Sequence, residues 1–470
     1  MAASKALITI EGKKGEATLS SDGVLRWPGG ALDILNEALG FSTGATSITI
    51  NSLPLAPGGC FRGPKRRVKS TILEFDEQKS HDDWGTTLEG IFASAGRPKR
   101  LIVIVNPKSG RGKAPEIYNQ DVEPLLKAAG VQYTTTFTTH WNHAKEIAQE
   151  AERRSCDGIV CVSGDGSAVE VMNGLLDRAD WQEAIQIPIG LVPAGSGNGL
   201  AKSFLTLAGE PYDPAGAVLA IILGQKKKLD VFTLSQGVKD YHGLLCVTWG
   251  FVSDVDIESE AFKWMGAARF TVQTVKRIIG LRQYHGTFHY LPADDMSLPS
   301  PSGRNMKESL LGGASTFDHG ESGADVGAWR REEGPFTLIW ANNTKWAATD
   351  MQIAPKAELS DGFLDVVIVN EIGRLKLLDL FLAIESGKHV DKGLKLGPGV
   401  FKYLKVKAFR FEPGGRKSDG KGGLLCVDGE VVARGPGAVG EASNDVMQYG
   451  PVVECQIRQA LATVFCGDKH

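Results

Sequence analysis

The stretch Ile159–Gly174 limits what this chain can fold into more than any other segment. It starts with four β-favouring residues, Ile159–Val162, and then turns at Gly164–Gly166. Apolar residues recur from Val169 onward at the spacing of a helix. The pattern predicts a buried strand, a tight turn and a helix. It places Asp165 at the carboxyl edge of the strand, where open α/β sheets bind their ligands.

The role of Asp165 stays open when this turn is considered alone. Its carboxylate can accept a proton, and the flanking Gly164 and Gly166 let backbone N–H groups approach a ligand. An Asp in such a turn can instead simply cap the following helix. Two further glycine-rich turns in the sequence favour the first interpretation.

Strands and helices alternate regularly around this stretch. Apolar runs predict further buried strands at Leu101–Val105, Val131–Thr136 and Ile187–Val192. Helices are predicted up to Leu126, from a cap at Asn142 to Arg154, and near Ala215–Gly224. The alternation predicts a Rossmann-like parallel α/β nucleotide domain with right-handed crossovers over residues 98–229.

A parallel sheet brings the ends of its first, third and fourth strands to one edge. There Asn106 begins a loop rich in Gly, Lys and Arg, and Gly195–Gly197 form a third glycine turn. Such turns bind phosphate through backbone N–H groups, and Lys108, Arg111 and Lys113 add positive charge. The spacing is neither that of a Walker A loop nor that of a dinucleotide fingerprint. A phosphate site beside a proton acceptor predicts phosphoryl transfer to an alcohol.

Residues 1–97 have the pattern of a small β-rich module. Strands are predicted at Ala6–Glu11, Gly15–Leu19, Gly23–Trp27, Ser47–Leu53 and Val68–Phe75. A helix that carries Trp84 follows, and this order of elements resembles a pleckstrin-homology-like module. The basic run at Lys65, Arg66, Arg67 and Lys69 is either a solvated strand edge or a contact for anionic lipid head groups.

Residues 230–470 are β-rich again and predict an antiparallel sandwich or curled sheet. Two helices, Phe262–Arg282 and Leu375–His389, interrupt the strands. Residues 294–334 are rich in Ser, Gly and Asp, which predicts a flexible insertion. The short basic run Lys226–Lys228 is interpreted as a solvated turn.

Composition excludes several classes of protein. The hydrophobic content of 42% and charged content of 23% are typical of a globular protein. A formal net charge of -3 does not favour a nucleic-acid binder. The seven cysteines form no CxxC pair, which predicts buried free thiols in a reducing compartment. Without a signal-peptide segment or an apolar run of about 18 residues, we expect a cytoplasmic protein that contacts membranes peripherally.

The turns also carry a family resemblance. Asn106-Pro107, the turn Ser163–Gly166 and the segment Pro193–Asn198 resemble the catalytic domain of diacylglycerol and sphingosine kinases. The block Gly250–Glu260, with Ala268–Phe270, is similar to sphingosine (long-chain-base) kinases in particular. The resemblance continues through Leu359–Gly362, Phe381–Ala383 and Val427–Glu430.

The resemblance implies an enzyme that transfers phosphate from ATP, with Mg²⁺, to the primary hydroxyl of a sphingoid base. It implies Asp165 as the proton acceptor and Asp256 as the contact for the substrate amine. The residues implied around the lipid are Ser163, Gly164, Asp165, Gly166, Asp254 and Asp256. Those implied around ATP are Asn106, Pro107, Lys108, Thr138, Thr139, His140, Trp141, Asn142, Glu170, Gly195, Ser196, Gly197, Lys263, Arg269, Asp428, Gly429 and Glu430.

Two positions depart from the family pattern. Ser167 follows the Gly-Asp-Gly turn where Leu or Thr is usual, and Lys263 stands where Arg is expected. Lys keeps the charge of Arg but loses its bidentate geometry. We therefore expect altered nucleotide affinity with activity retained.

The acidic pair Asp254 and Asp256 agrees with an amine-bearing substrate. A carboxylate about 3 Å from an ammonium forms a charge-assisted hydrogen bond. Diacylglycerol and ceramide have no ammonium and cannot form this bond. If the strand that begins at Leu244 continues to Asp256, both side chains point the same way, and one of them is enough to contact the amine. A solvated acidic loop is the alternative.

Two rival functions and several structural questions stay open. One rival is a kinase for a neutral lipid, diacylglycerol or ceramide, and the other is a catalytically silent lipid-binding adaptor. The apolar face of Leu375–Ile384 either lines a pocket for the lipid tail or packs on the sheet. His140 and His143 lack a third ligand, so no metal site is predicted. A homodimer is left open.

Overall fold

The computed structural model describes residues 4–58, 63–152, 155–266, 268–293, 329–440 and 445–468. The chain forms two compact units. The first comprises Met1–Gly195, Phe204–Lys227 and Thr463–His470, and the second comprises Ser196–Ser203 and Lys228–Ala462. The three-part division at residues 97 and 229 stays a prediction.

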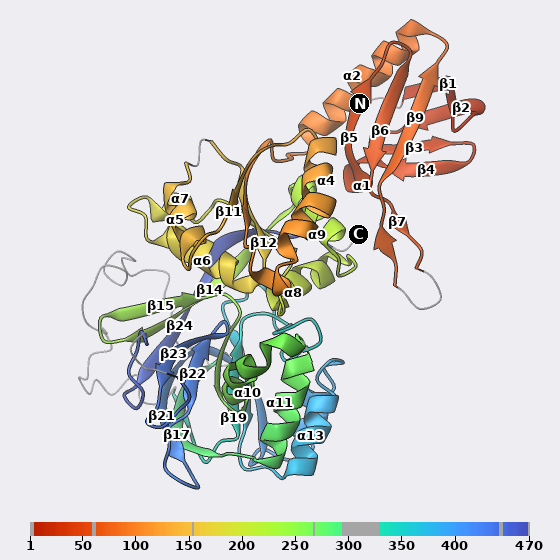
Figure 1. Ribbon diagram of the computed structural model, residues 1–470. Coiled ribbons are helices and arrows are strands. Elements are labelled where there is room, and N and C mark those ends of the chain that lie inside the picture. The colour runs from red at the N-terminus through yellow and green to blue at the C-terminus, as the bar shows by residue number, and fades with distance from the viewer. Residues whose placement is uncertain are drawn as a thin grey trace. The chain divides into compact units, whose positions relative to one another are not determined.

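The first unit begins with a seven-stranded antiparallel sheet in the order β4-β3-β2-β1-β9-β6-β5 (Figure 1). Its strands are β1 (Ser4–Ile10), β2 (Lys13–Leu19), β3 (Val24–Trp27), β4 (Gly30–Asp33), β5 (Ala38–Thr43), β6 (Ser47–Ser52) and β9 (Lys69–Phe75). The five predicted strands are confirmed. β4 and β5 were not predicted, because neither alternates apolar and polar residues.

Helix α2 (Gln78–Ser94) closes this sheet by burying Trp84, Leu88 and Ile91. The short helix α1 (Ile34–Glu37) and the hairpin β7 (Leu55–Ala56) and β8 (Lys65–Arg66) complete the region. Arg66 does not lie on a solvated edge. It pairs with Glu210 at 2.6 Å and with Glu37 at 3.6 Å, so it is unavailable to lipid head groups.

A four-stranded parallel sheet follows in the order β11-β10-β12-β13. Its strands are β10 (Arg100–Val105), β11 (Gln132–Phe137), β12 (Gly158–Ser163) and β13 (Ile189–Pro193), and Ile189 also pairs with Val464 of β24. The predicted parallel sheet is confirmed. Val105 pairs with Val162, and Val162 pairs with Val192, so these three strands end level with one another.

Helices cover both faces of this sheet (Figure 1). They are α3 (Ala114–Ile117), the π-helical turn η2 (Tyr118–Val122), α4 (Glu123–Ala128), α5 (His143–Glu150), α6 (Asp165–Leu176), α7 (Trp181–Ala184), α8 (Gly199–Ala208) and α9 (Pro214–Leu223). α5 ends at Glu150, four residues before the predicted end. α8 was not predicted, because its glycine-rich start hides the apolar periodicity that follows.

The second unit is built on antiparallel pairing in the order β24-β21-β20-β19-β16-β22-β23. These strands are β16 (Cys246–Gly250), β19 (Leu338–Asn342), β20 (Leu364–Val369), β21 (Phe401–Arg416), β22 (Leu424–Val427), β23 (Glu430–Arg434) and β24 (Val453–Phe465). β17 (Tyr284–Pro292) pairs with β21, and β14 (Lys226–Gln236) pairs with β15 (Lys239–Gly243). Trp249, Phe288, Phe336 and Phe411 lie at the centre of the core.

Several predicted boundaries in this part of the chain are wrong. Lys226–Lys228 begin strand β14 instead of forming a turn. The helix predicted at Phe262–Arg282 is a 3₁₀ segment, η3 (Glu260–Met265), followed by α11 (Ala268–Ile279). The helix predicted at Leu375–His389 is divided into α13 (Arg374–Leu382) and α14 (His389–Leu394).

The predicted insertion at residues 294–334 lies largely outside the described residues. Its last part is regular, because Arg330–Glu333 form strand β18 and pair with β17. Six of the seven cysteines are described, and all six are buried and unpaired. Within the described ranges, we find no helix with the length and apolar character needed to cross a membrane.

Candidate active site

The phosphate-binding turns predicted from the sequence lie at one edge of the parallel sheet. The backbone N–H of Asn106, just after β10, donates to the Val162 carbonyl of β12 at 3.2 Å. The N–H of Ala194, just after β13, donates to the Ser163 carbonyl at 3.0 Å. The loop after β10, the Asp165 turn and the start of the third turn are therefore neighbours, as predicted.

The loop after β10 is folded onto the other two turns. Ser109 accepts a hydrogen bond from the Gly164 N–H through its hydroxyl at 3.3 Å, and Asn106 accepts one from the Lys108 N–H at 3.0 Å. Gly110 has φ of 59°, and a Cβ atom there would lie 2.2 Å from the Ala194 carbonyl oxygen. Only glycine fits this close approach, so the glycine of the loop brings its backbone against the third turn.

Positive charge at this edge is not neutralised by the protein. Lys108, Arg111 and Lys113 are exposed, and within the described ranges none of them forms an ion pair. The N-terminus of α6, with its unsatisfied N–H groups, begins at the same edge. Three free cations, a helix N-terminus and glycine turns are together suited to a polyphosphate.

Asp165 is the first residue of α6, and its side chain is only 7% exposed. The N-cap position belongs to Gly164, so Asp165 is not the N-cap residue of α6. Its carboxylate lies at the edge of the sheet where the phosphate site is predicted, and its role stays a prediction.

The segment Thr138–Asn142 follows β11 at the same end of the sheet. Thr138 donates its N–H to the Val105 carbonyl at 2.9 Å, and the Thr139 N–H donates to Nδ1 of His143 at 3.1 Å. Asn142 occupies the N-cap position of α5 with φ of 64°, but its side chain makes no capping bond. At that end of α5, the Glu170 carboxylate accepts a hydrogen bond from the Ala144 N–H at 3.2 Å.

No metal-binding group of three or more His, Cys, Asp or Glu side chains occurs in the described part of the chain. His140 and His143 stack with ring centroids 4.6 Å apart, and His140 contacts Glu146. The two histidine side chains therefore contact each other and a nearby residue of the same segment.

The acidic pair in the second unit lies on a helix and not on a strand, so the predicted strand to Asp256 is wrong. β16 ends at Gly250, whose φ of 82° turns the chain into α10 (Phe251–Ser259). A Cβ atom on Gly250 would lie 2.7 Å from the Thr337 carbonyl oxygen. On a helix, residues two apart point about 200° away from each other. Asp254 and Asp256 therefore face different surroundings.

Asp254 is fully engaged inside the protein. Its carboxylate accepts a hydrogen bond from the Tyr284 hydroxyl at 2.6 Å and one from the Arg282 guanidinium at 3.0 Å. Burial raises the pKa of Asp254, although Tyr284 and Arg282 oppose that rise. The side chain is 2% exposed, so Asp254 is bound within the protein, and its role as a lipid contact stays a prediction.

Asp256 is the carboxylate that remains open. Among the described residues, none donates a hydrogen bond to it. Burial raises the pKa of Asp256 to about 6, whereas the charge of Arg269 on α11 lowers it. An acceptor without a partner in a largely enclosed position is suited to binding an ammonium group.

Asp428, Gly429 and Glu430 form the turn between β22 and β23. The Asp428 carboxylate accepts three backbone N–H groups, from Leu244 at 2.7 Å, Leu245 at 2.9 Å and Cys246 at 2.8 Å. It therefore fixes the start of β16. A Cβ atom on Gly429 would lie 3.6 Å from Oδ2 of Asp256, so this turn packs against the open carboxylate.

Each unit therefore holds part of the predicted set. Asn106, Pro107, Lys108, Thr138–Asn142, Ser163–Gly166, Glu170 and Gly195 belong to the first unit, and Ser196, Gly197, Asp254, Asp256, Arg269 and Asp428–Glu430 belong to the second. The Lys263 side chain lies outside what the structure describes. Sequence reasoning missed Tyr284 and Glu258, and it used Arg282 only as the end of a helix.

Comparison with known proteins agrees with this arrangement. The family described as "Diacylglycerol kinase catalytic domain" matches residues 100–234, and the "YegS C-terminal NAD kinase beta sandwich-like domain" matches residues 314–447. A putative diacylglycerol kinase from Bacillus anthracis str. Sterne has the same fold, with a TM-score of 0.52 and 18% identity over 78% of this chain and 95% of that one. The chain therefore combines a diacylglycerol-kinase-type catalytic fold with a C-terminal β-sandwich domain.

Two relatives are similar over most of the sequence. Sphingosine kinase 1 of Arabidopsis thaliana is 37% identical over 468 residues, which cover 97% of this chain and 95% of that protein. Sphingosine kinase 1 of Homo sapiens is 34% identical over 345 residues, which cover 72% of this chain and 87% of that protein. These similarities show that the chain belongs to the sphingosine kinase family.

Proposed function

We propose that this enzyme transfers the γ-phosphate of ATP to the primary hydroxyl of a sphingoid base, giving the 1-phosphate. The observation that carries this proposal is the difference in surroundings between two carboxylates on α10. Asp254 is bound by Arg282 and Tyr284, whereas Asp256 keeps an open carboxylate. A sphingoid base offers an ammonium close to its reacting hydroxyl, and Asp256 is suited to bind that ammonium.

The residues of the sheet edge divide the remaining tasks. The loop that begins at Asn106, with Lys108, Arg111 and Lys113, binds the phosphates of ATP. Asp165 accepts the proton of the attacking hydroxyl as the new P–O bond forms, and ADP leaves with the electrons of the broken bond.

Magnesium fits this arrangement as a companion of ATP. Mg²⁺ is usually held by substrate phosphates and one or two carboxylates. Asp165 is the acidic side chain at the phosphate-binding edge that could contact it. When bound, the ion neutralises charge on the terminal phosphates.

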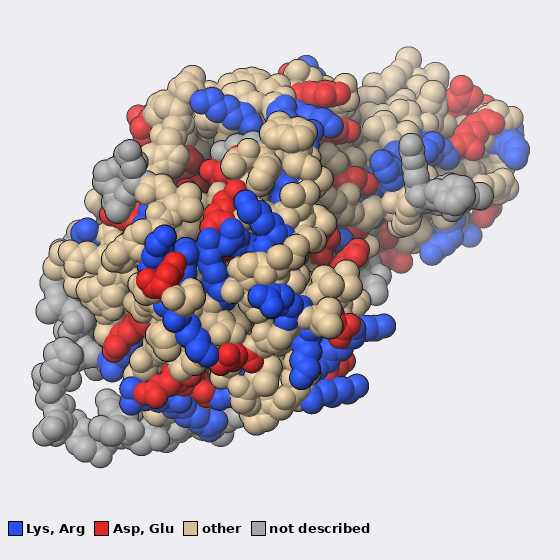
Figure 2. Space-filling model, turned by 60° about the horizontal axis from the view of Figure 1, so that its bottom comes forward, with Lys and Arg blue, Asp and Glu red and all other residues tan. Residues whose placement is uncertain are grey.

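We further propose that the second unit contacts a membrane through α11, α13 and α14. Ile279, Leu375 and Leu382 are exposed by 68%, 83% and 76%, and Arg374 donates to the Ile279 carbonyl at 2.9 Å, which joins α13 to the end of α11. Lysines border these residues: Lys276, Lys376, Lys388, Lys392 and Lys395. The space-filling view shows many Lys and Arg side chains on the face that is turned forward, with Asp and Glu side chains and uncharged surface among them (Figure 2).

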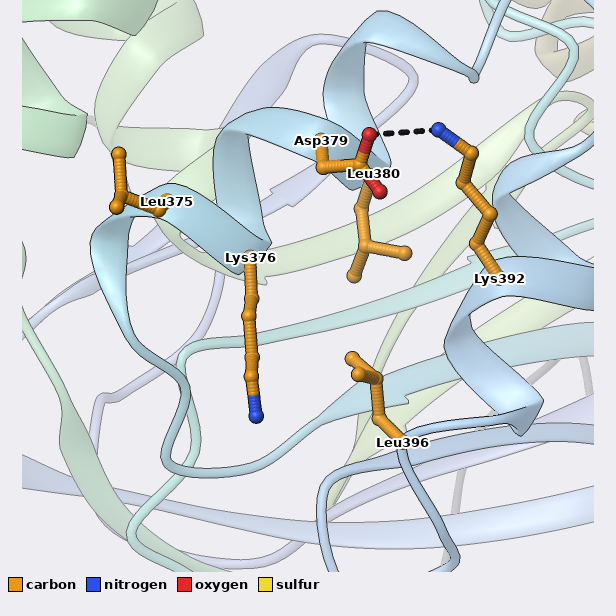
Figure 3. Close-up of a pocket in the computed structure, with 6 residues that line it drawn as sticks. All are labelled: Leu375, Lys376, Asp379, Leu380, Lys392 and Leu396. Carbon is orange, nitrogen blue, oxygen red and sulfur yellow. Dashed lines mark hydrogen bonds and ion pairs between the residues drawn. The ribbon is translucent and has the colours of Figure 1, made fainter.

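The pocket between α13 and α14 belongs to this face (Figure 3). It is lined by Leu375, Lys376, Asp379, Leu380, Lys392 and Leu396. Lys392 pairs with Asp379 at 2.6 Å, whereas Lys376 points away from that pair. Exposed leucines among lysines match an anionic lipid surface, so we infer a peripheral, cytoplasmic membrane contact. The inner residues of α13, Leu377 and Leu380, pack inward instead.

The test of the reaction is transfer of labelled γ-phosphate from Mg-ATP to sphinganine, with ceramide and diacylglycerol measured in parallel. We expect label on sphinganine alone. Label on a neutral lipid alone would contradict the role of Asp256. ATP binding without transfer to any lipid would instead support the adaptor.

A further inference from the structure

Helix α10 carries a third acidic residue, Glu258, on the same face as Asp254. Residues four apart on a helix are neighbours on its surface. One nitrogen of Arg282 binds both carboxylates, at 3.0 Å from Asp254 and 2.8 Å from Glu258. Arg282 lies two residues before the start of β17, so these two contacts join α10 to the segment that leads into that strand.

The second oxygen of Glu258 is bound from α11. It lies 2.7 Å from Nε2 of Gln273 and 2.9 Å from Nε of Arg277. The Gln273 side chain is 0% exposed, although Gln is rarely buried in full. Glu258 of α10 is therefore bound both from α11 and from the segment that leads into β17.

Helix α11 buries little apolar surface against the described part of the protein. Gln273 and Ile278 are its buried residues, and Val272, Val275 and Ile279 face outward. A helix with so little buried apolar surface gains most of its local stability from polar contacts. The contacts of Glu258 are the polar contacts that hold the middle of α11.

The start of α11 carries a cation that acts on Asp256. Arg269 is the second residue of α11, it lies 4.0 Å from Glu260 of η3, and its charge lowers the pKa of Asp256. The other charged groups that face Asp256 are Glu260 of η3 and Glu430 of β23, and the thiols of Cys246 and Cys426 lie nearby on β16 and β22. Arg269 is therefore the cation that favours the ionised form of Asp256.

We propose that Glu258 is a positioning residue for the sphingoid base. It holds α11 against α10, which keeps the charge of Arg269 near Asp256, the carboxylate proposed to bind the substrate ammonium. This inference rests on the proposed function. Glu258 itself touches no reacting group, since its carboxylate is fully engaged by Arg282, Gln273 and Arg277.

The first test is hydrogen exchange of the full-length Glu258→Gln variant, which needs no enzymatic activity. We expect the backbone amides of α11 to exchange about tenfold faster or more, because charge-assisted hydrogen bonds are lost. Amides of β19 and β20, in the core of the same unit, should keep their rates. Unchanged exchange in α11 would overturn the proposal.

The second test is steady-state kinetics of the same variant. We expect KM for sphinganine to rise about tenfold and kcat to change by less than about threefold, while KM for ATP rises less than KM for sphinganine, because Arg269 is also implied around ATP. The fall of kcat/KM at low pH should begin at a higher pH than in the wild type. Equal losses in all three parameters, or none, would contradict a positioning role.

Two further variants test whether the effect is specific to the contacts of Glu258. Gln273→Met removes one contact of Glu258 with an apolar side chain of similar size, and it should reproduce the rise in KM. Glu371→Gln removes an exposed carboxylate, which is paired with Lys417, and it should leave KM unchanged. Wild-type protein that fails to phosphorylate sphinganine would contradict the proposed function, whereas the exchange experiment would still test the contact with α11.

Discussion

At the scale of single residues, two carboxylates carry the proposed chemistry, and their surroundings separate them. Asp165 begins α6 at the phosphate-binding edge, and Asp256 faces the turn at Gly429. Asp165→Asn should lower kcat by about 10²–10⁴-fold, because general-base catalysis contributes that much. The fold should be unchanged, because Asn has nearly the same size and shape as Asp.

The matched control is Asp177→Asn, at the other end of α6. Asp177 pairs with Lys145 at 2.7 Å on a partly exposed surface, and such pairs contribute about 1 kcal/mol or less. The control should keep its kcat. Labelled phosphate transfer to sphinganine measures both variants, and near wild-type turnover of Asp165→Asn would rule out the base.

Asp256 predicts a dependence on pH. Its pKa of about 6 means that the carboxylate becomes protonated as the pH falls through 6, and a neutral acid binds an ammonium poorly. We expect kcat/KM for sphinganine to fall about tenfold between pH 7 and pH 5, since one unit below the pKa leaves about a tenth ionised. The Asp256→Asn variant should have a lower kcat/KM at pH 7, and its kcat/KM should not fall further between pH 7 and pH 5. If the variant keeps the wild-type dependence of kcat/KM on pH, the fall is caused by the titration of another group.

At the scale of elements, α13 and α14 present leucines that no described part of the protein covers. Fully burying a leucine side chain is worth about 1.5–3 kcal/mol, so Leu375→Asp should weaken binding to anionic vesicles about tenfold or more. Val238→Asp is the control, because Val238 is also exposed but lies at the β14–β15 turn. Co-sedimentation with phosphatidylserine vesicles measures both. Equal losses would show that the effect is general repulsion.

At the scale of the whole molecule, Arg66 fastens the N-terminal sheet within the first unit. Its guanidinium binds Glu210 through two nitrogens, at 2.6 and 2.9 Å, and donates to the Leu53 carbonyl at 3.0 Å. Arg66→Met should cost about 2 kcal/mol, less than the ~3–5 kcal/mol of a fully buried pair. Thermal unfolding should then occur about 4–8 °C lower.

Arg67→Met is the matched control, because Arg67 is the exposed neighbour. It should unfold at the wild-type temperature. If Arg67→Met weakens binding to anionic vesicles and Arg66→Met does not, the lipid contact predicted for the basic run belongs to Arg67. If both variants are stable and bind vesicles normally, neither role holds.

The sequence by itself determined the parallel sheet and its three turns. Buried strands such as Leu101–Val105 and Ile159–Val162 are continuous apolar runs, and their glycine turns are local signals. The closeness of the three turns could also be predicted from the sequence, because the ends of parallel strands lie at the same edge of the sheet. The family resemblance added Asp256, which no periodicity singles out.

Only the tertiary structure decided what surrounds Asp254 and Asp256. Gly250 turns the chain from β16 into α10 at a point where the sequence continues to look like a strand, because the close approach to Thr337 requires glycine. Arg282 and Tyr284 lie 28 and 30 residues from Asp254, so no local pattern reveals that they bind it. Contacts between distant residues left one carboxylate engaged and the other open, and that difference is a property of packing.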